Sequence, residues 1–70
     1  MNIAEKLASE IRRVTELKAQ YEALDGTHGV NVKPAIHMMD AALKYAIKSA
    51  GLPDAVTQIA ALRDLEGFTS

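Results

Sequence analysis

Large apolar residues return at steps of three and four along positions 3–24, and this spacing restricts the fold more than any other feature of the chain. At about 100° per residue such positions share one face of an α-helix, in a stripe roughly 140° wide that suits a helix packed on a core. The residues of this stripe are Ile3, Leu7, Ile11, Val14, Leu17, Tyr21 and Leu24. Asn2 can cap the helix, and Glu5 three residues later completes the pattern of a capping box. The sequence therefore predicts a long amphipathic helix over 3–24.

The charged residues of this segment fall into two groups. On the outer face, Arg12–Glu16 and Lys18–Glu22 are spaced for i,i+4 ion pairs, each worth about 0.2–0.5 kcal/mol. Glu10 and Lys18, however, have angles inside the apolar stripe. Long charged side chains at the edge of such a stripe usually extend along apolar surface to water. A charged contact across an oligomer interface is the alternative interpretation.

Glycine and proline divide the rest of the chain. The segment DGTHGVN at 25–31 contains a strong turn signal and is longer than a tight helical hairpin needs. A second helix is expected over 34–50, because Pro34 suits a first turn and Gly51 suits a left-handed position after the last turn. Leu52 would then fold back on Ile47, as in a Schellman motif.

A third helix is expected over 53–66. The residues that it should bury are Ala55, Val56, Ile59, Leu62 and Leu65. Gly67 and Phe68 repeat the pattern of a glycine followed by a large apolar residue, so both shorter helices are expected to end alike. No strand pattern competes with these helices. The sequence predicts an all-α fold, one long helix against two shorter ones, in a single domain over 1–70.

The length of the chain limits how this fold can be stabilised. Seventy residues bury a modest core, and small domains usually gain stability from disulfides, metal ions or association. The chain has no cysteine, and the spacing of His28 and His37 is not one of the usual zinc patterns. We therefore expect no metal and no cofactor, and association between copies as the support.

Charge and hydropathy exclude several classes of partner. The net charge is −1, so no basic excess attracts nucleic-acid phosphates. Residues 46–64 have a helix–turn–helix order, but residues 52–70 carry three acids and one base, which disfavours entry into a DNA groove. No apolar run approaches the roughly 18–20 residues of a membrane span, and residues 1–13 lack the apolar core of a secretion signal. We expect a cytoplasmic protein.

The expected second helix is apolar on two sides. Its main face holds Ile36, Met39, Leu43, Ala46, Ile47 and Ala50, joined by Ala35 and Ala42. A second patch of Met38, Ala41 and Tyr45 lies on the far side. A helix that is apolar on two sides is either central or shared with another copy, and three helices cannot cover both sides. We expect these three residues in a homo-oligomer interface. The alternative is that Met38 and Tyr45 flank an asymmetrical core, since methionine often fills gaps.

A polar strip separates the two patches. It contains His37, Asp40 and Lys44, with Asp40 placed to pair with Lys44 at i,i+4 and to meet His37 at i,i+3. Helix N-termini and lysines attract anions, so this strip could hold a small anionic ligand, joined by Lys33 and by His28 from the loop. An aromatic ring nearby would suit a nucleotide. The candidate ligand-binding residues, at an intersubunit pocket, are Lys33, His37, Lys44, Tyr21 and Tyr45. Ordinary solvated surface is the alternative.

No pattern of catalytic residues is present in the sequence. No serine or threonine lies in a nucleophile elbow, and GTHG at 26–29 lacks the Gly-Lys-Ser/Thr end of a phosphate loop. We therefore expect a binding protein rather than an enzyme.

With its opening MNIAEKLASEIRRVTELKAQYEAL and its ending ALRDLEG, the chain resembles short, cysteine-free, all-helical accessory proteins of bacteriophages and prophages. No family-specific motif matches, so no functional residue is transferred. The resemblance implies action without catalysis, in one of two ways. Such proteins occlude a host protein, or they oligomerise and sequester a nucleotide signal used in host defence. Both hypotheses, inhibition through an exposed helix face and nucleotide capture between subunits, remain open at this point.

Overall fold

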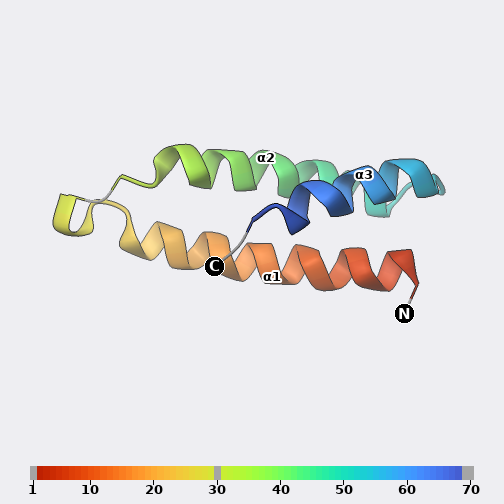
Figure 1. The fold of residues 1–70 in the computed structure, drawn as a ribbon, viewed down its shortest axis with the longest axis horizontal. Helices are drawn as coiled ribbons and strands as arrows, with labels where there is room; N and C mark the ends of the chain where they lie inside the picture. Colours follow the sequence, from red (N-terminus) through yellow and green to blue (C-terminus); the bar gives the residue numbers. More distant parts are fainter. Residues whose placement is uncertain (1, 30, 69–70) are drawn as a thin grey trace.

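The computed structural model describes residues 2–29 and 31–68, apart from the side chain of His28, and this part of the chain is helical without strands. Helix α1 spans Ile3–Leu24, α2 spans Lys33–Ala50 and α3 spans Ala55–Glu66, with a short 3-10 turn, η1, at Thr27–Gly29. Helices α1 and α2 form a long antiparallel hairpin, and α3 packs on the half of it that holds the start of α1 (Figure 1). The predicted all-α fold of three helices is confirmed.

Helix α1 begins and ends at the predicted residues. Asn2 has an extended backbone, and its Oδ1 accepts a hydrogen bond from the backbone N–H of Glu5 at 2.8 Å. The helix stops at Leu24 because Asp25 returns to an extended conformation and Gly26 adopts a positive φ of 80°, which glycine tolerates best. Local sequence therefore sets both boundaries of this helix.

Helices α2 and α3 do not end in the predicted left-handed motifs. The φ angles of Gly51 and Gly67 are −86° and −70°, both right-handed. The last turn of α2 tightens instead, with the N–H of Gly51 donating to Lys48 O at 3.2 Å and that of Leu52 to Ser49 O at 3.0 Å. These bonds between residues three apart satisfy the free carbonyls without a positive φ, so the predicted Schellman geometry is wrong for both helices.

Helix α3 begins two residues later than predicted, because Asp54 caps it. The carboxylate Oδ1 accepts from the N–H groups of Val56 at 3.0 Å and Thr57 at 3.4 Å, and Oδ2 accepts from the Thr57 hydroxyl at 2.6 Å. The hydrogen bonds from the Thr57 hydroxyl and backbone lower the pKa of Asp54 below 3.8. The ionised carboxylate is therefore the form that stabilises the start of α3.

We expect Asp54→Ala to lower the urea midpoint at neutral pH, and this deficit to shrink in acid. A carboxylate whose pKa is lower in the folded state stabilises fully above its unfolded pKa, about 3.9, and loses this effect as pH falls through the folded pKa. Circular dichroism at neutral pH and at about pH 2 measures the midpoints of wild type and variant. Asp54→Asn, which keeps a capping oxygen but cannot ionise, is the control. A deficit for Asp54→Ala that is equal at both pH values would contradict this role of the ionised group.

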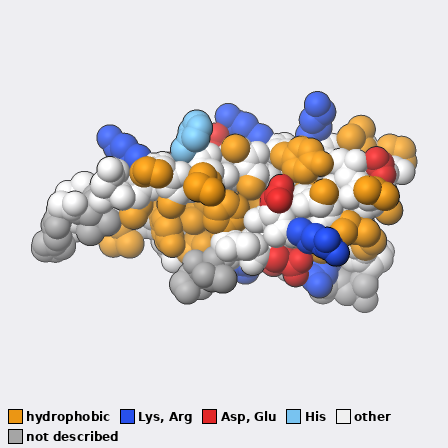
Figure 2. All heavy atoms as spheres, turned by 45° about the horizontal axis from the view of Figure 1, so that its top comes forward, with side chains coloured by type: hydrophobic (Ala, Val, Ile, Leu, Met, Phe, Trp, Pro, Cys, Tyr) orange, Lys and Arg blue, Asp and Glu red, His pale blue; other side chains and the backbone are white. Residues whose placement is uncertain are grey.

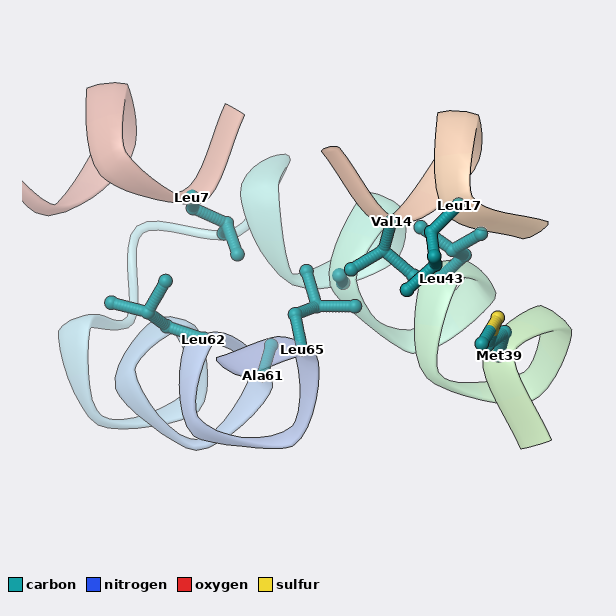
Figure 3. Packing of buried hydrophobic residues seen from close by; sticks show 9 residues of the cluster. Leu7, Val14, Leu17, Met39, Leu43, Ala61, Leu62 and Leu65 are labelled. Atoms are coloured by element: carbon teal, nitrogen blue, oxygen red, sulfur yellow. The ribbon is translucent and has the colours of Figure 1, made fainter. Parts of the chain in front are cut away.

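All three helices contribute to one apolar core. Its buried residues are Leu7, Val14 and Leu17 of α1, Met39, Leu43 and Ala46 of α2, and Ala61, Leu62 and Leu65 of α3. Figure 3 shows the side chain of Leu65 pointing from α3 toward the space between the other two helices. Ile11, Tyr21, Ala42 and Phe68 pack around this cluster and are partly buried. The core thus depends on the docking of α3 as much as on the hairpin.

The structure corrects the predicted burial of both shorter helices. Ala55, Val56 and Ile59 of α3 are exposed, Val56 at 76% of its surface, and so are Ile47 and Ala50 of α2. The cause in α3 is rotation about its axis. Its buried face is centred on Ala61 and Leu65, and Val56 lies about 140° around the helix from Ala61.

Glu10 takes part in a contact within the chain. It accepts a hydrogen bond from Arg13 Nε, and Arg13 Nη2 donates to the backbone carbonyl of Leu65 at 2.9 Å. A cation at the C-terminal carbonyls of a helix is favourable, so this hydrogen bond stabilises the packing of the end of α3 on α1. The predicted Arg12–Glu16 ion pair does not form among the described residues.

Candidate functional site

Helix α3 is too short to cover the α1–α2 hairpin. It has 12 residues, against 22 in α1 and 18 in α2. At 1.5 Å per residue α3 is about 18 Å long and α1 about 33 Å, so about 15 Å of the hairpin next to its loop has no third helix. The molecule is correspondingly elongated, with extents of 43 × 19 × 16 Å. Figure 2 shows a broad hydrophobic patch on this half of the molecule.

An open groove of about 430 Å³ lies where α3 ends. Its lining residues, which define the α2–α3 groove, are Met38, Ala41, Ala42 and Tyr45 of α2, Asp64 of α3, and Phe68. The side chains of Met38 and Tyr45 are prominent, with 62% and 41% of their surfaces exposed. The groove therefore presents apolar and aromatic surface with one carboxylate.

Local sequence explains the shape of this groove. Met38 and Tyr45 are seven residues apart, which places them two turns from each other on one side of α2. Ala41 and Ala42 between them have small side chains, so the surface between the two larger residues stays low. At the end of α3 the N–H of Phe68 donates to Leu65 O at 3.1 Å, and this tight turn returns the phenyl ring to the edge of the core.

The structure brings the three predicted interface residues together on this groove. Met38, Ala41 and Tyr45 all line it, and all are exposed. The sequence missed Asp64 and Phe68, because their position depends on where α3 stops against the hairpin. It assigned Ala42 to the main apolar face, and Ala42 is in fact shared between the edge of the core and the groove. The homo-oligomer interface itself remains a prediction.

A second, smaller hollow lies on α1. It has a volume of about 110 Å³ and is lined by Arg13, Glu16, Leu17 and Gln20. Because Arg13 binds the carbonyl of Leu65, this hollow lies beside the last turn of α3. The surface is therefore hollowed on both helices of the hairpin next to the end of α3.

The polar strip of α2 includes an ion-pair triad that joins two helices. Asp40 Oδ2 is 3.0 Å from Lys44 Nζ, as predicted, and its Oδ1 is 3.1 Å from Lys18 Nζ of α1. Hydrogen bonds from Lys44 and Lys18 lower the pKa of Asp40 below 3.8. Lys18 thus contacts α2 within the same chain rather than forming the predicted pair with Glu22. Asp40 makes no hydrogen bond to His37 in the described part of the chain.

The candidate ligand-binding residues lie on different surfaces of the monomer. Lys33, His37 and Lys44 follow the outer side of α2, while Tyr45 is about 100° around the helix from Lys44 and lines the α2–α3 groove. Tyr21 packs against the core from α1. The side chain of His28 lies outside the described residues. A pocket between subunits that would gather these residues stays a prediction.

Two further properties bear on the kind of site. With the side chain of His28 left aside, no group of three His, Asp or Glu side chains in residues 2–29 and 31–68 is arranged to hold a metal ion. Over the same ranges, no helix has the length and apolar character that crossing a membrane requires.

Comparison with family models, curated proteins and solved structures found no match to this chain. The α2–α3 groove and the uncovered part of the hairpin beside it are therefore the candidate functional surface.

Proposed function

We propose that this chain is a helical binding protein that acts without catalysis and uses the α2–α3 groove as its binding surface. The observation that supports this proposal is the pairing of two large exposed side chains, Met38 and Tyr45, with a floor of alanines. Such a surface is suited to the apolar face of a helix from another protein chain, laid into the groove. The floor allows a close approach, and the larger side chains contact the flanks of the incoming helix.

The energetics of burial favour this use of the groove. Full burial of one large apolar side chain contributes about 1.5–3 kcal/mol. Because Met38 and Tyr45 are 62% and 41% exposed, covering the rest of both would contribute about 1.5–3 kcal/mol together, which makes them the main apolar contacts of the groove. Asp64 at the rim adds a single charge, which can select a partner with a basic or hydrogen-bond-donating residue beside its apolar face.

The setting of this function follows from the resemblance to phage accessory proteins. On that basis the partner is a protein of a bacterial host, in the cytoplasm, and binding acts by covering a surface that the host protein needs. Sequestration of a nucleotide signal is the alternative from the same resemblance, and no contact described above favours it. A thermal shift with a panel of nucleotides at millimolar concentration tests that alternative separately.

We expect Tyr45→Glu to weaken capture of a bacterial partner at least about tenfold, which corresponds to about 1.4 kcal/mol. The reason is that binding would bury a carboxylate in an apolar groove without a counter-charge. The measurement compares immobilised wild type and variant as baits in host lysate, with quantitative mass spectrometry of the captured proteins.

The matched control for this experiment is Val56→Glu. Val56 is more exposed than Tyr45 and lies on the outer side of α3, away from the groove. The proposed function requires a captured protein that is lost with Tyr45→Glu and retained with Val56→Glu. Capture that is equally strong with both variants would contradict the proposal that the groove is the binding surface.

A further inference from the structure

We infer that the α2–α3 groove also binds a second copy of this chain when no host protein occupies it, with the two copies packed antiparallel across a two-fold axis near Met38. This inference rests on the proposed function, because it takes the groove to be a binding surface, and it adds a second copy of the chain as the occupant in the absence of a host protein.

The position of α3 restricts how a second hairpin can approach. Helix α3 lies on one face of the α1–α2 hairpin and occupies the layer that an incoming hairpin would have to enter. The incoming hairpin therefore has access only over the uncovered part, about 15 Å long. A hairpin running in the same direction would collide with α3. A hairpin running in the opposite direction meets the uncovered part with its own loop end and carries its own α3 away from the contact.

The antiparallel arrangement is self-complementary. A two-fold axis sets the same patch of each copy against the other, so both uncovered ends are covered by one contact. The middle of the pair then contains four helices, two from each hairpin, and each outer end keeps its three-helix core. Met38 lies near the centre of the uncovered part of α2 and would approach the Met38 of the other copy.

The exposed area of the chain sets the expected strength of this contact. A compact protein of 7.6 kDa exposes about 4300 Å² by the usual scaling with mass, whereas this chain exposes 4744 Å². Each copy thus exposes about 450 Å² beyond the compact expectation, near half of the ~800 Å² per partner of a standard interface. This area supports a reversible dimer that dissociates on dilution, rather than an obligate one.

The charges of the hairpin are compatible with this contact. Asp40 is paired with Lys18 and Lys44, on the side of α2 away from the groove. Of the residues that line the groove, Asp64 alone is charged, and it lies at the α3 end, away from the axis near Met38. The lining of the groove therefore brings no like charges together at the centre of the antiparallel pair.

The test uses single cysteines, because the chain has none of its own. We expect Met38→Cys to form a covalent dimer with a short bismaleimide, and Val56→Cys, more exposed but outside the contact, to remain uncoupled. Addition of Tyr45→Glu to Met38→Cys should reduce the coupled fraction at least tenfold. Light scattering of the unmodified chain over a dilution series should show a dimer that dissociates, and circular dichroism confirms that the variants are folded.

The results separate failure of this inference from failure of the proposed function. The inference of a second copy in the groove is wrong if the chain is a monomer at every concentration. It is also wrong if Met38→Cys and Val56→Cys couple equally. If the monomer still captures a host protein and Tyr45→Glu abolishes this capture, the groove remains a binding surface. In that case only the second copy as its occupant is wrong. If Tyr45→Glu changes neither self-association nor capture, both the inference and the proposed function fail.

Discussion

Leu65→Ala is expected to lower the free energy of unfolding by about 2–5 kcal/mol, the range for truncating a buried leucine. Leu65 is fully buried and is one of only three apolar side chains that α3 contributes to the core. The alanine would leave a cavity where α3 faces the other two helices (Figure 3). Domains of this size have a total stability of about 4–10 kcal/mol, at 0.05–0.15 kcal/mol per residue. The variant should therefore lose a large part of its folded population near room temperature.

Urea unfolding followed by circular dichroism measures this loss. Leu52→Ala is the matched control, because Leu52 lies in the turn between α2 and α3 with 42% of its surface exposed. We expect its free energy of unfolding to fall by only about 1 kcal/mol, because only part of its side chain is buried. If the two leucine variants lose stability equally, the packing of α3 on the hairpin is not as described.

The parts of the fold that sequence could predict are those set by local interactions. The boundaries of α1 depend on the Asn2 cap and on the turn at Asp25-Gly26, and both act within a few residues. The apolar stripe of α1 is confirmed in its middle, where Leu7, Val14 and Leu17 are buried, but Leu24 at its end is 52% exposed because the core does not extend to that turn. Prediction from periodicity works when one face is clearly more apolar than the others.

The buried face of α3 could not be predicted in this way. Val56 and Ile59 are larger and more apolar than Ala61, yet Ala61 is buried and they are exposed. The choice between faces is made by the docking of α3 against two other helices, where a small residue lets the backbones approach. Hydropathy along a single helix contains no information about that contact.

In the candidate site, too, some residues could be predicted from one helix and others only from the packing of helices. Met38, Ala41 and Tyr45 could be selected from α2 alone, because they form a second apolar side on one helix. Asp64 and Phe68 line the groove only because the end of α3 packs beside α2. Lys18 of α1 pairs with Asp40 of α2 only because the two helices lie side by side in the hairpin. Sequence therefore identified one wall of the groove, and the fold supplied the other.

The length of α3 links stability to the proposed function. Each further turn of α3 would cover more of the hairpin and bury more apolar surface, which would stabilise the monomer. It would also fill the layer through which a partner reaches Met38 and Tyr45. A short α3 thus leaves the monomer with a smaller core and an open groove, and the proposed association would supply the missing burial.

Ala61→Leu tests how closely α3 is packed on the hairpin. Ala61 has no exposed surface, and a leucine there would add three carbon atoms to a filled part of the core. Overpacking of this kind costs about 1–3 kcal/mol, because neighbouring side chains leave their preferred rotamers or the helix moves outward. Helix propensity contributes little, since leucine ranks close behind alanine. We expect a lower urea midpoint and, because α3 is displaced at its C-terminal half, weaker coupling in the Met38→Cys background.

Ala60→Leu makes the same chemical change one residue earlier, on the exposed side of α3. We expect this variant to unfold within about 0.5 kcal/mol of wild type and to couple through Met38→Cys as before. The comparison isolates the orientation of the helix, because composition, charge and propensity are identical in the two variants. Equal loss of stability in both would mean that α3 does not present Ala61 to the hairpin. The groove would then lack the wall formed by Asp64 and Phe68, which depends on that orientation.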